Sequence, residues 1–340
     1  MSVRHRVVIT GLGAVTAVVT GGAEAVTRAI AAAIPADGER IDRTLAQLVD
    51  GAEARRLSRV SQLTLAAGRL ALDDAGLASA SAPMLGIVLG TELGDLRSTI
   101  AFADGFLSRG PAGLSPLLFP NTVMNTMAAA TAIAVSARDL SLTLNAPTVA
   151  GELAVIRAAG AVAAGRAAAL LAGGVDELDP AVGTVLEEAG GRFAARGEGS
   201  AFVVLESLDS ARARGARILG EILGVASAAL PASPYGVGRV VSARVIARAL
   251  AQAAVEPAAL RAVYAGENGD ARRDAWESRV LRHAVPRAPA GPSLARQFGQ
   301  TSALGPLKVV AAAGAPPALV HGLARGGSEV ALVIDAARPR

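Results

Sequence analysis

The chain contains no cysteine and very few aromatic residues. The absence of cysteine among 340 residues excludes disulfide bonds, thiolate metal sites and a thiol nucleophile. The three histidines do not share the spacing of metal ligands, so we predict no metal site. Aromatic residues make up 3% of the sequence. A core must therefore consist mainly of Ala, Val, Leu and Ile, with Gly allowing close approach of backbones.

Charged residues and long apolar runs are also scarce. Charged residues account for 18% and hydrophobic residues for 52%, which predicts a large buried core and argues against disorder. The net charge is +4, but no basic run is interleaved with aromatics, so we expect no nucleic-acid partner. Arg166 and several glycines interrupt the apolar run 158–174, and Glu24 and Arg28 interrupt the first Ala-rich stretch. We therefore expect neither a membrane span nor a signal segment, and a cytoplasmic protein.

What is present is an alternation of strand-like and helix-like segments. The first part of the chain predicts strands at 7–9, 84–89, 140–144, 168–171 and 202–206, and helices at 23–33, 56–75, 120–135 and 150–164. A looser repeat predicts strands at 218–225, 262–265 and 330–334, and helices at 240–255, 276–283 and 305–313. Gly11-Leu12-Gly13 is interpreted as a tight turn after the first strand. Two similar α/β halves, 1–208 and 209–340, predict an α/β fold with five layers, α/β/α/β/α, and two central sheets.

Several motifs occur in a characteristic order. They are VITGLG at 8–13, RLSR at 56–59, the segment 115–122, LLAGGVD at 170–176 and GEGS at 197–200. In this order and spacing the chain resembles the β-ketoacyl-acyl carrier protein synthases of the thiolase superfamily. The resemblance implies a thiolase-like fold, an acyl carrier protein as partner and no cofactor.

The resemblance also implies that the reactive residues have been replaced. Counting back from Gly173 places Thr148 where the family has its nucleophilic cysteine, at the start of a buried helix. Gly266 and Gln300 stand where the family has its two histidines. Losing one donor to a developing oxyanion typically costs about 10²–10³ in rate. We therefore expect no Cys-His-His condensation chemistry and no catalytic residues.

Three polar residues have two interpretations each, and a fourth, His321, has one. Thr148 is either an alternative nucleophile, which would need a base within reach, or a polar filler of a vacated pocket. Gln300 either donates to a substrate carbonyl or satisfies buried backbone. Glu152 is interpreted as a carboxylate stabilised by a helix N-terminus rather than as a catalytic acid. His321 precedes the loop of Arg325 and could approach the pocket.

The loop 323–329 departs from the family's C-terminal glycine-rich loop. Arg325 replaces a gating phenylalanine and Glu329 replaces an asparagine, as the resemblance implies. A guanidinium in an apolar tunnel is costly unless it is paired. We hypothesise that Arg325 pairs with Glu329, Glu267 or Glu152 and plugs the acyl channel.

Among relatives without catalytic residues, the chain resembles the chain length factors of type II polyketide synthases. The resemblance implies a subunit that forms a heterodimer with an active ketosynthase and shapes the acyl tunnel. The segment 115–135 would form the interface, with Phe119, Met124 and Met127 facing the tunnel. One departure is Thr148, since many chain length factors carry Gln at that position.

A carrier-protein contact and two other functions are also considered. The strip of Arg55, Arg56 and Arg59 would dock an acidic acyl carrier protein, although a solvated helix face explains it equally well. An acyltransferase or thioester hydrolase that uses Thr148 is one alternative function. A homodimeric scaffold that binds acyl carrier protein without any tunnel role is the other.

Overall fold

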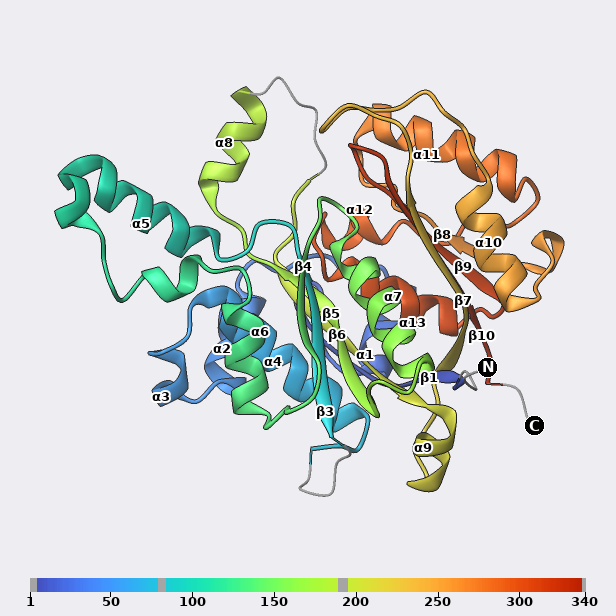
Figure 1. The fold of residues 1–340 in the computed structure, drawn as a ribbon, viewed down its shortest axis with the longest axis horizontal. Coiled ribbons are helices and arrows are strands. Elements are labelled where there is room, and N and C mark those ends of the chain that lie inside the picture. Colours follow the sequence, from blue (N-terminus) through green and yellow to red (C-terminus); the bar gives the residue numbers. More distant parts are fainter. Residues whose placement is uncertain (1–4, 79–83, 189–194, 338–340) are drawn as a thin grey trace.

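The computed structural model describes residues 5–78, 84–188 and 195–337 and has a mixed α/β fold built on one large sheet (Figure 1). The strand order is β4-β3-β5-β6-β1-β7-β10-β9-β8, and the short β2 (Thr20–Gly21) pairs with β1. The strands of the first half are β1 (Val7–Thr16), β3 (Leu85–Thr91), β4 (Ser141–Asn145), β5 (Ala169–Asp176) and β6 (Gly199–Ser207). Those of the second half are β7 (Gly220–Ala229), β8 (Ala262–Tyr264), β9 (Ala318–Leu323) and β10 (Ser328–Asp335).

The pairing pattern repeats between the two halves. In the first half β1–β6 and β6–β5 are antiparallel and β5–β3 is parallel. In the second half β7–β10 and β10–β9 are antiparallel and β9–β8 is parallel. The prediction of two similar α/β halves is thereby confirmed, while the boundary between residues 208 and 209 stays a prediction.

The two expected central sheets are hydrogen-bonded to each other. Val7–Ile9 of β1 pairs in antiparallel register with Gly220–Ile222 of β7, so the two half-sheets join into one ten-stranded sheet. The expectation of two separate sheets is corrected on this point. The joint covers only the first residues of both strands, and beyond it the two strands diverge.

Helices form three layers around the strands. Helices α7 (Ala150–Ala163) and α13 (Leu304–Ala313) lie inside, in a core shared by the inner faces of both half-sheets. Helices α4 (Arg59–Asp74) and α6 (Thr126–Ala134) cover the outer face of the first half. Helices α10 (Arg244–Ala253) and α11 (Ala271–Ala284) cover the outer face of the second half. The expected layer order α/β/α/β/α is present.

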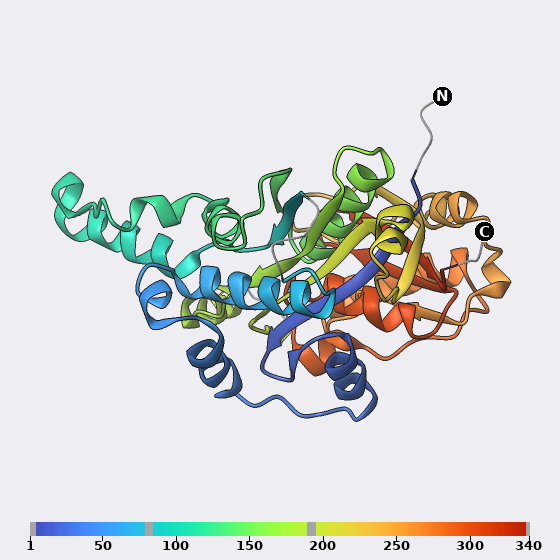
Figure 2. The same ribbon diagram turned by 90° about the horizontal axis from the view of Figure 1, so that it is seen from below.

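The remaining elements lie mainly at the periphery. They are α1 (Ala23–Ala31), α2 (Arg40–Leu48), α3 (Gly51–Ala54), α8 (Pro180–Glu188), α9 (Leu208–Ala213), η3 (Pro257–Ala259) and α12 (Leu294–Phe298). A further group, α5 (Leu96–Arg109), η1 (Gly110–Gly113) and η2 (Phe119–Thr122), extends sideways from the sheet (Figures 1 and 2). We call residues 96–125 the arm. Within the described ranges, no helix has the length and apolarity needed to cross a membrane.

The predicted turn at Gly11-Leu12-Gly13 is wrong, because these residues lie inside β1. Their glycines serve close packing instead: a Cβ on Gly13 would lie 2.2 Å from the carbonyl oxygen of Ala67 in α4. The predicted helix at 120–135 begins only at Thr126, after a 3-10 turn. Strand β9 was not predicted, because His321 and Gly322 interrupt its apolar pattern.

Candidate functional site

Three loops meet at the N-terminal end of α7. Thr148 lies between β4 and α7, Asn268 follows β8, and Gln300 lies between α12 and α13. The Gln300 side chain bridges the other two loops. Its Oε1 accepts from Asn268 Nδ2 at 3.1 Å, and its Nε2 donates to the Thr148 carbonyl oxygen at 3.3 Å. The structure thus brings Thr148 and Gln300 together, and Gln300 is only 4% exposed.

Thr148 has an unusual backbone conformation. Its φ is +66°, in the left-handed region that β-branched residues rarely occupy. Such backbone strain concentrates at present or former functional sites. Within the described part of the chain, the Thr148 hydroxyl has no hydrogen-bond partner, so no base is positioned to take its proton. Among the described residues, the strained turn has no neighbouring group bonded to its hydroxyl that would activate it.

Gly266 does not join this cluster. Its backbone N–H donates to Glu277 Oε1 at 2.9 Å, and its carbonyl accepts from Arg273 Nη2 at 2.6 Å. A Cβ on Gly266 would lie 3.1 Å from Arg273 Nη1, which is toward α11. The residue that meets Gln300 is instead Asn268, which sequence reasoning missed. The sequence did contain a signal, since Asn268 is an amide residue in the loop between an expected strand and an expected helix.

Asp176 fixes the loop that carries Gln300. Its Oδ2 accepts from the Ser302 backbone N–H at 2.7 Å and from the Ser302 hydroxyl at 2.6 Å. Its Oδ1 accepts from Thr91 Oγ1 and the Glu92 backbone N–H, at the end of β3. Burial raises the pKa of Asp176, although the hydrogen bonds from Ser302 oppose this. The last residue of the LLAGGVD motif therefore ties two strand ends to the loop before α13.

Arg325 pairs with Asp270, which corrects the hypothesis about its partner. Its Nε and Nη2 donate to the two carboxylate oxygens of Asp270 at 2.5 and 2.9 Å, and its Nη1 donates to the Tyr235 carbonyl at 3.1 Å. Burial works against charge on Asp270, but the hydrogen bonds from Arg325 outweigh it and lower the pKa of Asp270. The Arg325 side chain is 23% exposed, so it lies near the surface and not deep in an apolar tunnel.

The three expected partners of Arg325 are engaged elsewhere. Glu267 pairs with Arg296 on the surface. Glu152, in the first turn of α7, is buried beside Lys308 of α13. Glu329 is buried against His321, whose Nε2 lies 3.2 Å from its Oε1. Each of these carboxylates is thus paired with a cation other than Arg325.

His321 is the centre of a buried ionic group below α11. Its Nδ1 lies 2.7 Å from Glu277 Oε1, and Glu277 Oε2 accepts from Arg273 Nη2 at 3.0 Å. Burial alone would lower the pKa of His321, but its hydrogen bonds to Glu277 and Glu329 outweigh burial and raise it. Burial raises the pKa of Glu277, yet the Arg273 charge and the His321 hydrogen bond bring it down to about 2.

This ionic group holds the loop of Gly266 and Asn268 through backbone hydrogen bonds to Glu277 and Arg273, but it does not reach the Thr148 turn in the described part of the chain. Both ring nitrogens of His321 are taken by carboxylates, so the imidazole is not available to the Thr148 turn. Glu329 shares its face of β10 with Ala331 and Val333, which pack in the outer core of the second half. The side chain of Glu329 is completely buried there, so it does not meet Arg325, and its expected place at the acyl tunnel stays a prediction.

The comparison with known families can now be set beside this geometry. The family model described as "Beta-ketoacyl synthase, N-terminal domain" matches residues 29–211, which is more than half of the chain. The chain belongs to the β-ketoacyl synthase family. Among relatives, 3-oxoacyl-[acyl-carrier-protein] synthase 2 of Synechocystis sp. is 29% identical over 326 residues, covering 83% of this chain and 77% of that protein. The enzyme of the same name from Vibrio harveyi is 28% identical over 194 residues, and the match spans 47% of its length.

Solved β-ketoacyl synthase structures share the fold over nearly the whole chain. The ishigamide ketosynthase/chain length factor superposes with a TM-score of 0.84 at 22% identity, covering 98% of this chain and 100% of that one. A β-ketoacyl synthase from Burkholderia phymatum gives 0.83 at 22% identity with the same coverage. These similarities confirm the thiolase-like fold.

The residues expected at the tunnel and interface lie in different environments of this β-ketoacyl synthase. Met127 is fully buried under α4, in the core cluster that includes Leu63 and Leu171, so the prediction that it faces a tunnel is wrong. Phe119 and Met124 are 58% and 38% exposed on the arm. The Phe119 ring leans on Phe102 of α5 with centroids 6.0 Å apart.

The expected carrier-protein strip is only partly open to solvent. Arg55 and Arg56 are exposed. Arg59 is not available in the same way, because its Nε and Nη2 donate to both carboxylate oxygens of Glu198 at 2.8 and 2.7 Å. Its Nη1 also donates to Asp42 at 2.6 Å. Arg59 therefore ties the start of α4 to the GEGS motif, and a docking role for it is not supported.

The chemistry open to the site follows from its groups. Gln300 and Asn268 can donate hydrogen bonds to a carbonyl, but amides do not exchange protons as imidazoles do. Among the described residues, no cluster of three or more His, Asp or Glu is placed to hold a metal ion. In the described part of the chain, the side chains that meet at Gln300 are amides, and these are bonded to each other and to the Thr148 backbone.

Proposed function

We propose that this chain is a non-catalytic ketosynthase-like subunit of the chain length factor type. It would form a heterodimer with an active β-ketoacyl synthase and shape the acyl tunnel while the partner extends a chain held on acyl carrier protein. The observation that carries this proposal is the Gln300 bridge. An amide bonded on one side to Asn268 and on the other to the Thr148 backbone occupies the centre of the site.

The Gln300 bridge supports the proposal that this chain does not catalyse condensation. Decarboxylation of a malonyl thioester requires donors aimed at a developing enolate oxygen, and acyl transfer requires an activated nucleophile. The Gln300 amide N–H group is directed at a backbone carbonyl, and the Thr148 hydroxyl has no base in the described structure. Restoring one group alone would leave the others missing.

The exposed apolar surface supports a subunit role. Large hydrophobic side chains gather on the arm and α6, which is unusual for an isolated chain. The most exposed of them are Leu117 at 88%, Ile133 at 81% and Leu107 at 79%. Close by, β4 is the edge strand of the sheet, and within the described ranges its one strand partner is β3. A partner that covers the arm and this open edge would bury both.

The names of the structural neighbours agree with this assignment. One neighbour is the ishigamide ketosynthase/chain length factor. Another is a type II PKS acyl-carrier protein in complex with its ketosynthase, with a TM-score of 0.77 at 20% identity. For a carrier-protein contact in this chain, the exposed Arg55 and Arg56 are the candidate residues.

Reconstitution with an active ketosynthase tests the proposal, and a ketosynthase gene adjacent to that of this chain would be the first choice. Co-expression should give a 1:1 complex by size-exclusion chromatography with light scattering, and products whose length changes when Phe119 or Met124 is replaced by Trp. The chain alone should release no carbon dioxide from malonyl-carrier protein. A stable homodimer that ignores the ketosynthase would contradict the proposal and favour the scaffold alternative.

One observation favours an acyl-transfer alternative. The left-handed φ of Thr148 at the start of α7 is a strained turn of the kind that presents nucleophiles. An enzyme of this kind would be acylated at Thr148 when incubated with an acyl thioester, and the Thr148→Ala variant would not. Intact-protein mass spectrometry distinguishes the two functions, because the proposed subunit stays unmodified in both forms.

A further inference from the structure

The inner strand β7 has an edge that no other strand covers. Along its whole length β7 pairs with β10 on one side. On the other side it pairs with β1 only through Gly220–Ile222. From Leu223 to Ala229, no strand within the described ranges covers this side. At about 3.3 Å per residue, roughly 23 Å of strand edge is left open.

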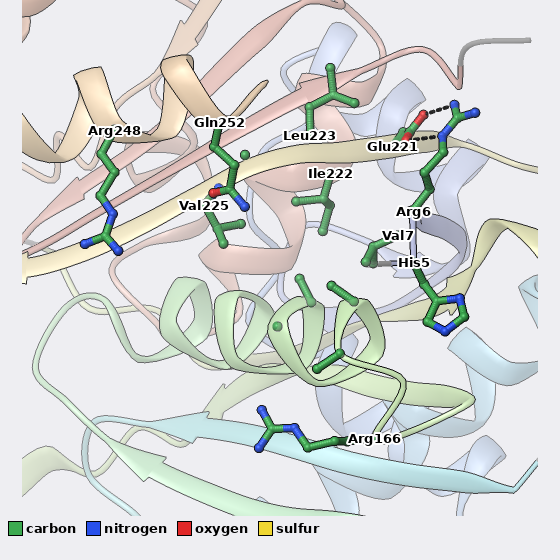
Figure 3. Close-up of a pocket in the computed structure, with 15 residues that line it drawn as sticks. His5, Arg6, Val7, Arg166, Glu221, Ile222, Leu223, Val225, Arg248 and Gln252 are labelled. Atoms are coloured by element: carbon green, nitrogen blue, oxygen red, sulfur yellow. Dashed lines mark hydrogen bonds and ion pairs between the residues drawn. The ribbon is translucent and has the colours of Figure 1, made fainter. Parts of the chain in front are cut away.

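This open edge follows a continuous groove. One cavity of about 850 Å³ is lined by residues 221–225 of β7, and a second of about 520 Å³ is lined by residues 226–229. Arg248 of α10 lines both, so the two cavities adjoin. Figure 3 shows β7 passing over α7, with Arg248 and Gln252 reaching the groove from α10 and Arg166 beyond α7.

The wall opposite β7 carries almost no side chain. It is formed by small residues of α7, among them Ala159, Gly160 and Ala163. A Cβ placed on Gly160 would meet nothing within 4 Å, so the groove is open at that point. One edge donor is protected, since the Val225 N–H is bonded to Gln252 Oε1 at 3.0 Å. Capping an edge N–H by a side chain is one way in which proteins manage an open strand.

The groove is strongly basic. Among the described residues that line it, the one carboxylate is that of Glu221, and Arg6 neutralises it by donating from Nε and Nη2 at 2.7 and 2.5 Å. Three guanidinium groups, those of Arg166, Arg244 and Arg248, make no side-chain hydrogen bond or ion pair in the described part of the chain. Neither end of the chain complements them, because the terminal segments carry Arg4, Arg338 and Arg340.

We propose that this groove binds an acidic, extended segment of another polypeptide, which adds as a strand to the open edge of β7. The backbone N–H and C=O groups of the edge would provide affinity, and the guanidinium groups would select acidic side chains. Displacement of the Gln252 side chain from the Val225 N–H would free the donor that the added strand needs. The proposal is independent of any role in condensation.

Fluorescence anisotropy with a synthetic probe tests the proposal. The probe is an acetylated eight-residue peptide that alternates Glu and Val, and it should bind the full chain. Two versions N-methylated at alternate residues remove the N–H donors of one peptide edge each and crowd that edge with methyl groups. At least one of them should bind ten times more weakly or worse. Equal binding of all three peptides would show that no strand is added and would overturn the proposal.

Variants of the chain locate the binding. The double variant Arg166→Glu with Arg248→Glu should weaken binding of the probe at least tenfold. The control is Arg279→Glu with Arg282→Glu on α11, which makes the same charge change on exposed residues elsewhere and should leave binding unchanged. Gly160→Phe, which fills the open point of the groove, should also block binding of the probe without lowering the melting temperature. If both double variants lost binding of the probe equally, or if Gly160→Phe bound it as well as wild type, the assignment of the site to this groove would be contradicted. Preferential binding of RNA or anionic vesicles over the peptide would contradict it as well.

Discussion

The residues that meet at Gln300 carry neutral side chains, whereas a cluster of charged side chains is buried in the core beneath α11. Around the Thr148 turn, the contacts of Gln300 and Asn268 are amide hydrogen bonds, which do not depend on pH. Below α11, by contrast, the cations Arg273 and His321 are matched by the buried carboxylates Glu277 and Glu329. Buried charges are tolerated only when they are paired in this way, so each member depends on the others.

The first prediction concerns His321. The variant His321→Leu leaves Glu329 buried without a cation and should lower the free energy of unfolding by about 3 kcal/mol or more. Because the pKa of His321 is raised in the folded state, its contribution is complete below its ordinary pKa and is lost as the pH rises through the folded value. Urea unfolding at several pH values should show that the difference in free energy of unfolding between wild type and variant becomes smaller above neutral pH. A difference that stays constant from pH 6 to 9 would count against charge on the imidazole.

A second prediction concerns Glu177, at the base of the arm. Its Oε1 accepts from the Arg97 backbone N–H at 3.0 Å in the first turn of α5, and burial raises its pKa to about 7. The folded state therefore binds an extra proton between about pH 4.5 and 7, so this carboxyl lowers stability as the pH rises through that range. A tenfold change in proton affinity is worth about 1.4 kcal/mol.

The variant Glu177→Gln keeps a hydrogen-bond acceptor and removes the titration. Above pH 7 it should be more stable than wild type by on the order of 2 kcal/mol, and near pH 4.5 the two should be equal. Thermal or urea unfolding at both pH values measures the difference. A variant that gained the same stability at pH 4.5 would show that something other than ionisation is responsible.

At the scale of elements, the crossing of α7 and α13 fixes the site. A Cβ on Gly151 would lie 2.0 Å from the Ser302 carbonyl oxygen, and a Cβ on Gly305 would lie 2.4 Å from the Glu152 nitrogen. The two helices therefore touch through backbone at the point where Thr148 and Gln300 meet. This contact sets the position of both loops more than any side chain does.

The third prediction follows from that contact. Gly151→Ala should cost about 2–4 kcal/mol or prevent folding, because backbone on both sides would have to move. Gly160→Ala on the same helix is the matched control, since its Cβ meets open space and Ala favours a helix by up to about 1 kcal/mol. Urea unfolding of the two variants should give changes of opposite sign. Equal effects would show that helix propensity, and not the crossing, governs α7.

At the scale of the whole molecule, the arm is the part that an isolated chain does not explain. It extends away from the sheet (Figure 2) and presents apolar side chains to solvent. Contiguous exposed apolar surface marks an interaction site in soluble proteins. The proposed ketosynthase partner would bury the arm. The rest of the chain would fold without the contacts that the arm makes with this partner.

The fourth prediction tests this division. The pair Leu117→Asp and Phe119→Asp should weaken the complex with the ketosynthase at least tenfold while leaving the melting temperature of the chain unchanged, since both side chains are mostly exposed. Val185→Asp on α8 changes another exposed hydrophobic residue, at 61%, and serves as the control. Analytical ultracentrifugation of the mixtures gives the affinities. A loss of chain stability in the arm variant would mean that the arm is part of the core.

Local patterns were sufficient for most regular elements. Continuous apolar runs predicted β5 and β6, which are buried on both faces, and small apolar residues predicted the inner helices α7 and α13. They failed where burial depends on distant partners. β9 carries His321, which is tolerated in a core only because Glu277 and Glu329 meet it there. The partner of Arg325 could not be chosen either, since Asp270 lies 55 positions away and several carboxylates fit equally well by sequence.

The sequence by itself determined the layered α/β fold, the family motifs and the absence of a thiol, because these depend on residue type and on short-range periodicity. Only the tertiary structure decided which groups meet. It placed Asn268, and not Gly266, against Gln300, joined the two half-sheets through β1 and β7, and left the far edge of β7 open. The physical reason is that hydrogen bonds and ion pairs are satisfied between segments far apart in the chain, where several partners of the same chemistry compete and packing geometry selects one.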